Sequence, residues 1–217
     1  MYIPAAFRET RPEMLQALMR QNSFATVVSH GAEGMVASHL PFLLDPERGP
    51  QGTLLGHMAR ANPQWQDFRD EAEVLVIFTG PHAYVSPSWY QAALSVPTWN
   101  YAAVHAYGIP TLVEESAALY GILAAMVRTY EAPLDEPWTL PPPDDFLSRM
   151  MKAIIGFEIR ITRVEGKLKL NQNRASADQE SVVAALRHYG DPLGIEVAEL
   201  MQRQATPHSP AQTDSDN

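Results

Sequence analysis

The spacing of apolar residues changes along the chain. It is first that of a helix, then the alternation typical of strands, and then again mainly that of helices. Residues 12–21 place four apolar side chains on one helical face behind Pro12, which suits a first helical position. Residues 23–104 contain short runs rich in β-forming residues, separated by Gly, Pro, Asn and Asp. These runs predict six strands, at 24–30, 35–45, 52–58, 73–79, 82–86 and 97–108.

Six closely spaced strands with no helix between each pair predict an antiparallel barrel rather than a doubly wound parallel sheet. A hairpin loop is expected at 30–34, between the first two strands. Two helical segments interrupt the strands at 62–70 and 86–94. Asn62 and Ser86 are their predicted N-caps, because each immediately precedes a proline.

The second half of the chain predicts mainly helices around one further strand. Thr111 and Glu114 have capping-box spacing and predict a helix from 111 to about 131, which Pro133 ends. Residues 154–170 alternate between apolar and polar side chains, as in a half-buried strand. An extended crossover is predicted at 131–145, and further helices at 144–153, 177–189 and 192–204. A capping box of Ser176 and Gln179 begins the helix at 177–189, and Gly190 ends it. Residues 205–217 are predicted to form an unfolded tail.

The composition narrows the class of protein. The chain is 46% hydrophobic and 19% charged, which is typical of a packed globule. Its 16 Lys and Arg against 25 Asp and Glu give a net charge of −9, so a generally basic nucleic-acid binder is excluded. Cysteine is absent, which excludes thiolate chemistry and disulfides. No apolar run approaches the roughly 20 residues of a membrane span, and Glu9 interrupts any signal peptide, so we expect a cytoplasmic protein.

Several kinds of catalytic or binding site find no support in the sequence. The histidines of the strand region are scattered, and no HxH, HxxxH or HExxH spacing supports a metal site. No GxSxG, GxGxxG or P-loop motif is present, so neither a hydrolase nor a Rossmann or triphosphate site is indicated. The histidines considered as ligands are His30, His39, His57, His82 and His105.

Two segments carry unusual chemistry. Along 97–108 one strand face bears Trp99, Tyr101, His105 and Tyr107, which fits either an aromatic core or the wall of a pocket for a flat, conjugated ligand. The segment 57–63 runs from a strand into a capped helix. Its His57 and Arg60 lie beside free helical amides, an arrangement that suits a phosphate, although an arginine in a turn is also a common solvated charge.

Five ordered motifs stand out along the chain: SHLPFLLD (38–45), GHMARANPQW (56–65), VLVIFTGPHAYVSPSWY (74–90), VPTWNYAAVHAYG (96–108) and GKLKLNQNR (166–174). Together they resemble the PaiB family of FMN-binding negative transcriptional regulators, over nearly the whole chain. This resemblance implies a mainly β, α+β fold, namely the six-stranded antiparallel split β-barrel of the FMN-binding split-barrel superfamily, with peripheral helices. It also implies FMN, with haem or another flavin-like ligand as alternatives, in pockets at the interface of a homodimer.

The resemblance also implies which residues bind the cofactor. His57 and Arg60 fall at the phosphate-contacting strand and turn, with Asn62 behind them and Ser38 and His39 on the neighbouring strand. The segment expected to cover the ring contributes Ser86, Trp89 and Tyr90, and the interface strand contributes Thr98, Trp99 and Asn100. Asn171 departs from the pattern, because a small hydroxyl residue is expected there.

Three functions of different classes remain open. The first is an FMN-binding regulator that acts on DNA or through a partner, and the second is a flavin- or haem-dependent oxidoreductase. The third is a ligand-free structural dimer. In each case residues 1–190 form the split-barrel domain, 191–204 a C-terminal helix and 205–217 a disordered tail.

Direct DNA contact, if it occurs, is expected from residues 148–188. This segment holds eight of the 16 basic residues, which fit either a solvated strand face or a phosphate-tracking stripe. They are Arg149, Lys152, Arg160, Arg163, Lys167, Lys169, Arg174 and Arg187.

Overall fold

The computed structural model describes residues 1–217 except 33, 71, 190 and 206–217. Its helices are α1 (Pro12–Gln21), α2 (Ser116–Glu131), α3 (Asp145–Lys152), α4 (Ser176–Tyr189) and α5 (Pro192–Ala205), with short 3-10 helices η1 (Ala5–Phe7), η2 (Pro63–Asp70) and η3 (Pro87–Trp89). Its strands are β1 (Arg8–Glu9), β2 (Phe24–Gly31), β3 (Gly34–Pro41), β4 (Leu43–Asp45), β5 (Thr53–Ala59), β6 (Val74–Val85), β7 (Thr98–Val113) and β8 (Ile154–Lys169).

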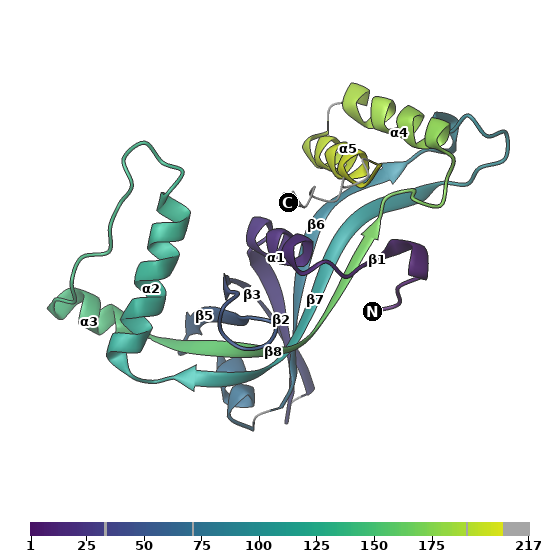
Figure 1. The fold of residues 1–217 in the computed structure, drawn as a ribbon. Coiled ribbons are helices and arrows are strands. Elements are labelled where there is room, and N and C mark those ends of the chain that lie inside the picture. The colour runs from purple at the N-terminus through teal and green to yellow at the C-terminus, as the bar shows by residue number, and fades with distance from the viewer. Residues whose placement is uncertain (33, 71, 190, 206–217) are drawn as a thin grey trace, which may run out of the picture. The chain divides into compact units, whose positions relative to one another are not determined.

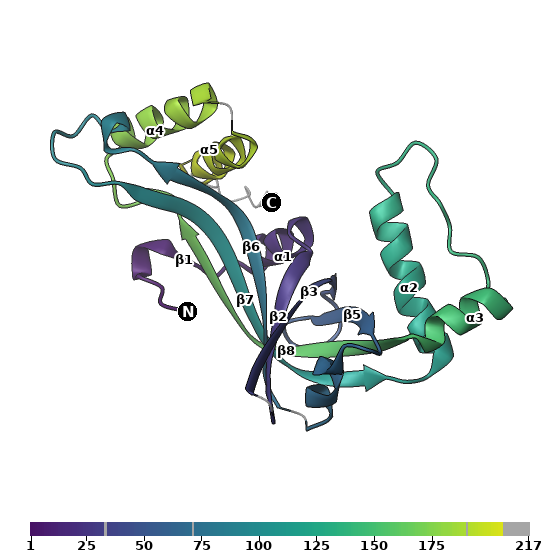
Figure 2. The same ribbon diagram turned by 180° about the vertical axis from the view of Figure 1, so that it is seen from behind.

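The strands form one antiparallel sheet in the order β3-β2-β6-β7-β8-β5-β4, with β1 paired to β8 (Figures 1 and 2). The hairpin of β2 and β3 pairs Thr26 with His39, and its turn lies at the predicted place. β5 pairs with β8, so that His57 lies opposite Gly156. The sheet therefore brings β5 beside a strand about one hundred residues later in the chain, which local sequence patterns do not reveal.

The predicted α+β fold with an antiparallel sheet is confirmed, but the sheet has eight strands instead of the predicted six, and the strand boundaries differ from the prediction. The run 35–45 divides into β3 and β4 at Phe42, whose backbone N–H donates to Ser23 O (2.9 Å) and whose ring is buried. The runs 73–79 and 82–86 form the single strand β6, which continues through Gly80 and Pro81. The two-residue strand β1 is too short to carry a sequence pattern.

The chain forms two compact units that share β6, β7 and β8. The first unit comprises residue 1, residues 9–80 and residues 103–166, and its core is built on Phe42, Phe68, Phe78 and Phe157. Edge-to-face contacts join these rings at centroid distances of 5.1–6.2 Å.

The second unit comprises residues 2–8, 81–102 and 167 onward. In this unit, α4 and α5 pack together through buried Val182, Leu186 and Val197. Among the described residues, no helix is long and apolar enough to cross a membrane.

Three helix predictions are confirmed closely, namely α1, α3 and α5. The predicted start at Thr111 is wrong, because Thr111 belongs to β7. The helix begins at Ser116, where the Glu115 carboxylate accepts hydrogen bonds from the N–H groups of Ala117 (2.9 Å) and Ala118 (2.8 Å). Thr111 and Glu114 have the correct spacing for a capping box, but Thr111 lies in β7. The helix therefore begins only after this strand has ended.

The predicted helix at 86–94 is also wrong beyond its first turn. Ser86 caps η3 as predicted, but the N–H groups of Gln91 and Ala92 donate to the Asp178 carboxylate (2.8 and 3.1 Å) instead of helical carbonyls. The predicted helix at 177–189 is confirmed as α4, although Ser176 is its first helical residue rather than its cap. Gly190, predicted to end this helix, and residues 206–217 of the predicted tail lie outside the described residues.

Candidate functional site

A polar corner forms in the first unit where β3 meets the turn after β5. The Asn62 side-chain amide donates to Ser38 Oγ (2.8 Å), and Asn62 Oδ1 accepts from the Gln64 N–H (3.0 Å). Asn62 therefore starts η2 as predicted, and it also joins two of the predicted site residues across the corner. One of the helical amides expected to face a phosphate is already used within the chain.

Gln64, which the sequence analysis did not single out, fixes the corner from inside. It is buried, and its Nε2 lies 3.1–3.2 Å from Val27 O, Val36 O and Ser29 Oγ. Ser29 Oγ in turn donates to Asp67 (2.7 Å). This hydrogen-bond network connects η2 to β2 and β3. It therefore also holds in place the turn that leads into η2 and carries Arg60 and Asn62.

The two predicted histidines of this region lie in different surroundings. His39 is exposed and lies on the face of β3 opposite to Ser38, because successive strand residues point to opposite faces. Its Nδ1 is 2.9 Å from Thr26 Oγ1, and its ring stacks on Phe24. His57 is half-buried on β5, and its buried Nδ1 has no hydrogen-bond partner among the described residues. Burial lowers the pKa of His57 below its ordinary value.

This pKa shift predicts an acid-sensitive stability. Because the folded protein binds the His57 proton less tightly than the unfolded chain does, the contribution of His57 to the free energy of unfolding should be constant above about pH 7. It should then fall as the pH drops through about 6.5, the ordinary histidine value. His105, whose pKa is also lowered by burial, acts in the same direction. Urea unfolding at pH 5, 6 and 7 should show a smaller loss in His57→Gln than in the unsubstituted protein, and equal losses in both proteins would contradict this assignment.

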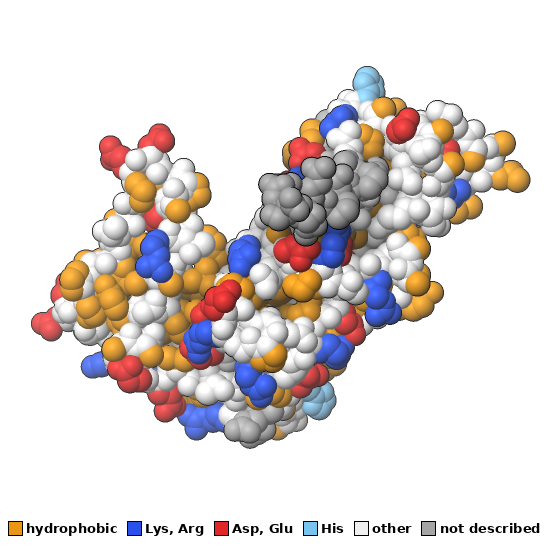
Figure 3. All heavy atoms as spheres, viewed as in Figure 1, with side chains coloured by type: hydrophobic (Ala, Val, Ile, Leu, Met, Phe, Trp, Pro, Cys, Tyr) orange, Lys and Arg blue, Asp and Glu red, His pale blue; other side chains and the backbone are white. Residues whose placement is uncertain are grey.

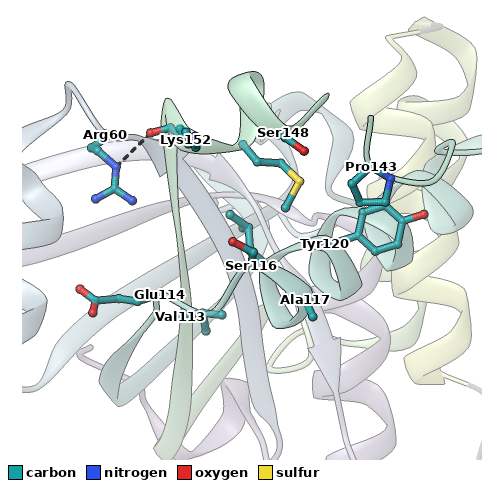
Figure 4. Close-up of a pocket in the computed structure, with 11 residues that line it drawn as sticks. Arg60, Val113, Glu114, Ser116, Ala117, Tyr120, Pro143, Ser148 and Lys152 are labelled. Atoms are coloured by element: carbon teal, nitrogen blue, oxygen red, sulfur yellow. Dashed lines mark hydrogen bonds between the residues drawn. The ribbon is translucent and has the colours of Figure 1, made fainter. Parts of the chain in front are cut away.

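Arg60 lines a cavity of about 560 Å³ in the first unit, between α2, α3 and the ends of β7 and β5 (Figure 4). Its guanidinium donates through Nε to Lys152 O (3.1 Å) and through Nη2 to Ile154 O (3.2 Å). Figure 4 shows Arg60 and Glu114 on one side of the cavity and Tyr120 and Pro143 on the other. Of the eleven predicted site residues, Arg60 is the one that lines this cavity.

The cavity has the chemistry of an amphipathic anion site. Arg60 and Lys152 supply two positive charges, and Ser116 and Ser148 supply hydroxyl groups. The wall also includes the carboxylate of Glu114, which forms an ion pair with Arg69 (3.7 Å), and apolar side chains such as those of buried Leu119 and Met151. Because both Arg60 bonds go to neutral carbonyls, its charge is not neutralised there by a carboxylate. The residues present fit a phosphate beside an apolar, planar group.

Six predicted site residues lie in the second unit, and those from 86–90 have mainly structural contacts. Ser86 Oγ accepts from the Ser88 N–H (3.3 Å), and the Trp89 ring stacks on Tyr189 at 5.4 Å. Tyr90 is buried, and its hydroxyl donates to Asn171 Oδ1 (3.3 Å).

Asn171, the residue that departs from the family pattern, has a φ of 63°. This left-handed conformation is tolerated by Asn better than by most side chains, which gives a backbone reason for Asn at this position.

The start of β7 carries three consecutive predicted site residues, Thr98, Trp99 and Asn100, and each side chain has a different environment. Asn100 is fully buried, its Nδ2 is 3.5 Å from Met201 Sδ, and its Oδ1 has no partner among the described residues. Trp99 is 54% exposed. Thr98 Oγ1 and the Trp99 carbonyl both accept from the Lys169 ammonium.

Two of the three lysines in the proposed basic stripe, Lys167 and Lys169, have hydrogen-bond partners within the chain. Lys167 is only 8% exposed and donates to Tyr2 O (3.2 Å), and Lys169 binds the start of β7. Sequence alternation gave no sign of this, because the contacts join segments 70 or more residues apart. DNA contact by the segment 148–188 stays a prediction, and its remaining candidates include Arg149 and Arg160.

Comparison with solved structures identifies the fold. The FAD and haem binding protein of Mycobacterium smegmatis superposes with a TM-score of 0.57 at 17% identity, over 82% of this chain and 79% of that one. The flavocytochrome Anf3 of Azotobacter vinelandii gives a TM-score of 0.57 at 12% identity, over 75% and 69% of the two chains. The antiparallel sheet and its helices are therefore those of a split-barrel protein, as predicted.

Sequence comparison identifies the family within this fold. Residues 1–163 match the family described as "Putative FMN-binding domain". The protein named protease synthase and sporulation protein PAI 2, from Bacillus subtilis, is 38% identical over 204 residues, which cover 93% of this chain and 97% of the relative. The chain belongs to this family, the PaiB family of split-barrel proteins, and the predicted resemblance is confirmed.

Proposed function

We propose that this protein binds FMN and acts as a PaiB-like negative transcriptional regulator. The observation that carries the proposal is the position of Arg60 in the wall of a cavity. The family resemblance assigns this residue to the cofactor phosphate, and independently of that assignment it lines a cavity of about 560 Å³ together with Lys152. A cavity of 300–1,000 Å³ is typical of cofactor sites.

In this proposal each part of the cofactor has a matching group. Arg60 and Lys152 hold the phosphate, with Ser116 and Ser148 as further donors, and Tyr120, Leu119 and Met151 line the apolar space beside it. Bound FMN would supply redox chemistry, while the protein binds it, orients it and excludes water.

A second copy of the chain is proposed to complete the pocket. Trp99 (54% exposed) and Tyr84 (46% exposed) present large apolar groups to solvent in the second unit, and burying them in a symmetric dimer would remove this exposure. Figure 3 shows further apolar side chains gathered over α3 and the adjoining part of α2, where the exposed residues include Phe146 and Met150. These surfaces support the predicted homodimer.

The direct test is the visible spectrum of the purified protein, followed by FMN titration and a mass measurement. We expect quenching of FMN fluorescence with one FMN per chain, and a light-scattering mass near twice 24.1 kDa. Absence of quenching would overturn the FMN assignment, and a mass near 24.1 kDa would overturn the dimer. Footprinting on promoter fragments, with and without FMN, tests the regulatory role, and the complete absence of protection would favour regulation through a protein partner.

A further inference from the structure

A second cavity of the first unit, of about 420 Å³, lies beside the last turns of α1 and α2. Its lining includes Arg20 from α1 and Arg128 from α2, together with residues of β4 and β5. No residue that the structure describes lines both this cavity and the Arg60 cavity, although α2 contributes to both. Figure 3 shows Lys or Arg side chains on both sides of the hollow beside α2. We call this space the Arg128 cavity.

Part of the lining of the Arg128 cavity is apolar. The Phe42 ring is buried, and the side chains of Leu43, Leu44 and Leu55 are half-buried beside it. Apolar side chains that remain partly in contact with water gain free energy when another apolar group covers them. This part of the cavity therefore favours the hydrocarbon portion of a ligand.

The two arginines of the cavity have no counter-ion. Neither guanidinium forms a hydrogen bond or an ion pair with another residue that the structure describes. Asp45, which also lines the cavity, is engaged elsewhere: its Oδ1 accepts from the Glu47 N–H (3.2 Å), and its Oδ2 lies 3.9 Å from Arg48 Nε. Both guanidinium groups, each with several N–H donors, are therefore available to an anion.

A hydroxyl group adds a further donor to the cavity. The Tyr130 hydroxyl donates to Ser23 Oγ (3.0 Å), and both residues line the cavity. This bond fixes the last turn of α2, which carries Arg128, against the segment that follows α1. Because Ser23 Oγ is the acceptor in this bond, its own proton is free to be donated to a ligand.

We propose that the Arg128 cavity binds a small organic anion. Its carboxylate or phosphate group would bind Arg20, Arg128 and Ser23, and its apolar part would lie on Phe42 and the neighbouring leucines. This site is separate from the proposed FMN site and does not depend on it. A purely structural role would assign both arginines to the helix ends, where a cation stabilises the last turn. That role accounts for the positive charges but not for a cavity with an apolar lining beside them.

The test titrates the purified protein with hexanoate and with hexyl phosphate by calorimetry. We expect one binding site per chain for at least one of these probes. Hexanol, acetate and inorganic phosphate should bind at least about tenfold more weakly, since each lacks either the anion or most of the alkyl chain. The probe that binds more tightly identifies the ligand as a carboxylate or a phosphate. If neither probe binds at millimolar concentration, the proposal is overturned.

Arginine variants show whether the probe occupies the proposed site. Arg20→Gln and Arg128→Gln should each weaken probe binding by about threefold to tenfold, a moderate effect because both side chains are exposed. Arg149→Gln is the matched control. It also removes an exposed arginine from the last turn of a helix, but it lines neither cavity, so probe affinity should not change. Lower thermal stability with unchanged probe affinity in Arg20→Gln and Arg128→Gln would assign these arginines to the helix ends and overturn the proposal.

Cross-titration with FMN separates this site from the proposed function. Arg60→Ala should retain the affinity for the probe, and Arg128→Gln should retain the affinity for FMN, because the two residues line different cavities. If Arg60→Ala weakens probe binding and Arg128→Gln does not, the probe occupies the Arg60 cavity and the second site is refuted. Failure of the unsubstituted protein to bind FMN would refute the proposed function and leave this inference standing.

Discussion

Replacing Arg60 by alanine is expected to weaken FMN binding by about 10- to 150-fold and to leave riboflavin binding nearly unchanged. A charge-assisted hydrogen bond contributes about 1.5–3 kcal/mol, and each 1.4 kcal/mol is about tenfold in affinity. Riboflavin lacks the phosphate, so it should not sense the loss of the guanidinium. Lys152→Ala should act in the same direction, because Lys152 lines the same cavity.

The measurement is a fluorescence titration of each variant with both flavins at several salt concentrations. Arg128→Ala is the matched control, because it removes an exposed arginine of α2 that does not line the Arg60 cavity. Equal FMN affinity in Arg60→Ala and in the control would mean that the phosphate binds elsewhere. Since Arg60 also holds the Lys152 and Ile154 carbonyls, thermal unfolding of each variant without ligand should accompany the titration.

Features set by neighbouring residues could be predicted from the sequence. Asn62 and Ser86 cap the turns where a capping residue precedes a proline, and the alternation of 154–170 gives β8 almost to the residue. The start of α2 could not be predicted in this way. Thr111 has a valid capping pattern, but its backbone is used by β7, and pairing in the sheet outweighs a cap worth about 1 kcal/mol.

The candidate site depends on contacts between distant segments, and this limits what the sequence reveals. Ser38 and Asn62 are 24 residues apart, and Lys169 meets Trp99 across 70 residues. Lys169 looked like part of a basic stripe because its sequence neighbours are basic. The sheet instead places its ammonium at the start of β7, where the adjacent residues are hydrogen-bond acceptors and aromatic rings. Only the strand order, with β7 next to β8, provides that information.

The largest effect on stability is expected from substitution of Phe157. Its ring lies in the core of the first unit and contacts β5, the strand that precedes Arg60. Its ring is fully buried, lies 5.1 Å from Phe68 and 6.0 Å from Phe42, and packs closely on Gly56 of β5. A Cβ added at Gly56 would lie only 2.6 Å from the Phe157 ring, so the glycine is required for this contact.

Phe157→Ala should therefore lower the free energy of unfolding by about 3–5 kcal/mol, since both apolar burial and close packing are lost. Phe157→Leu keeps most of the volume and should cost less than about half as much. Urea unfolding measures both effects, with the exposed Phe24→Ala as a control expected to change stability by less than about 1 kcal/mol. A loss below about 1.5 kcal/mol for Phe157→Ala, with an unchanged denaturant slope, would show that the core closes around the missing ring and that β5 does not depend on it.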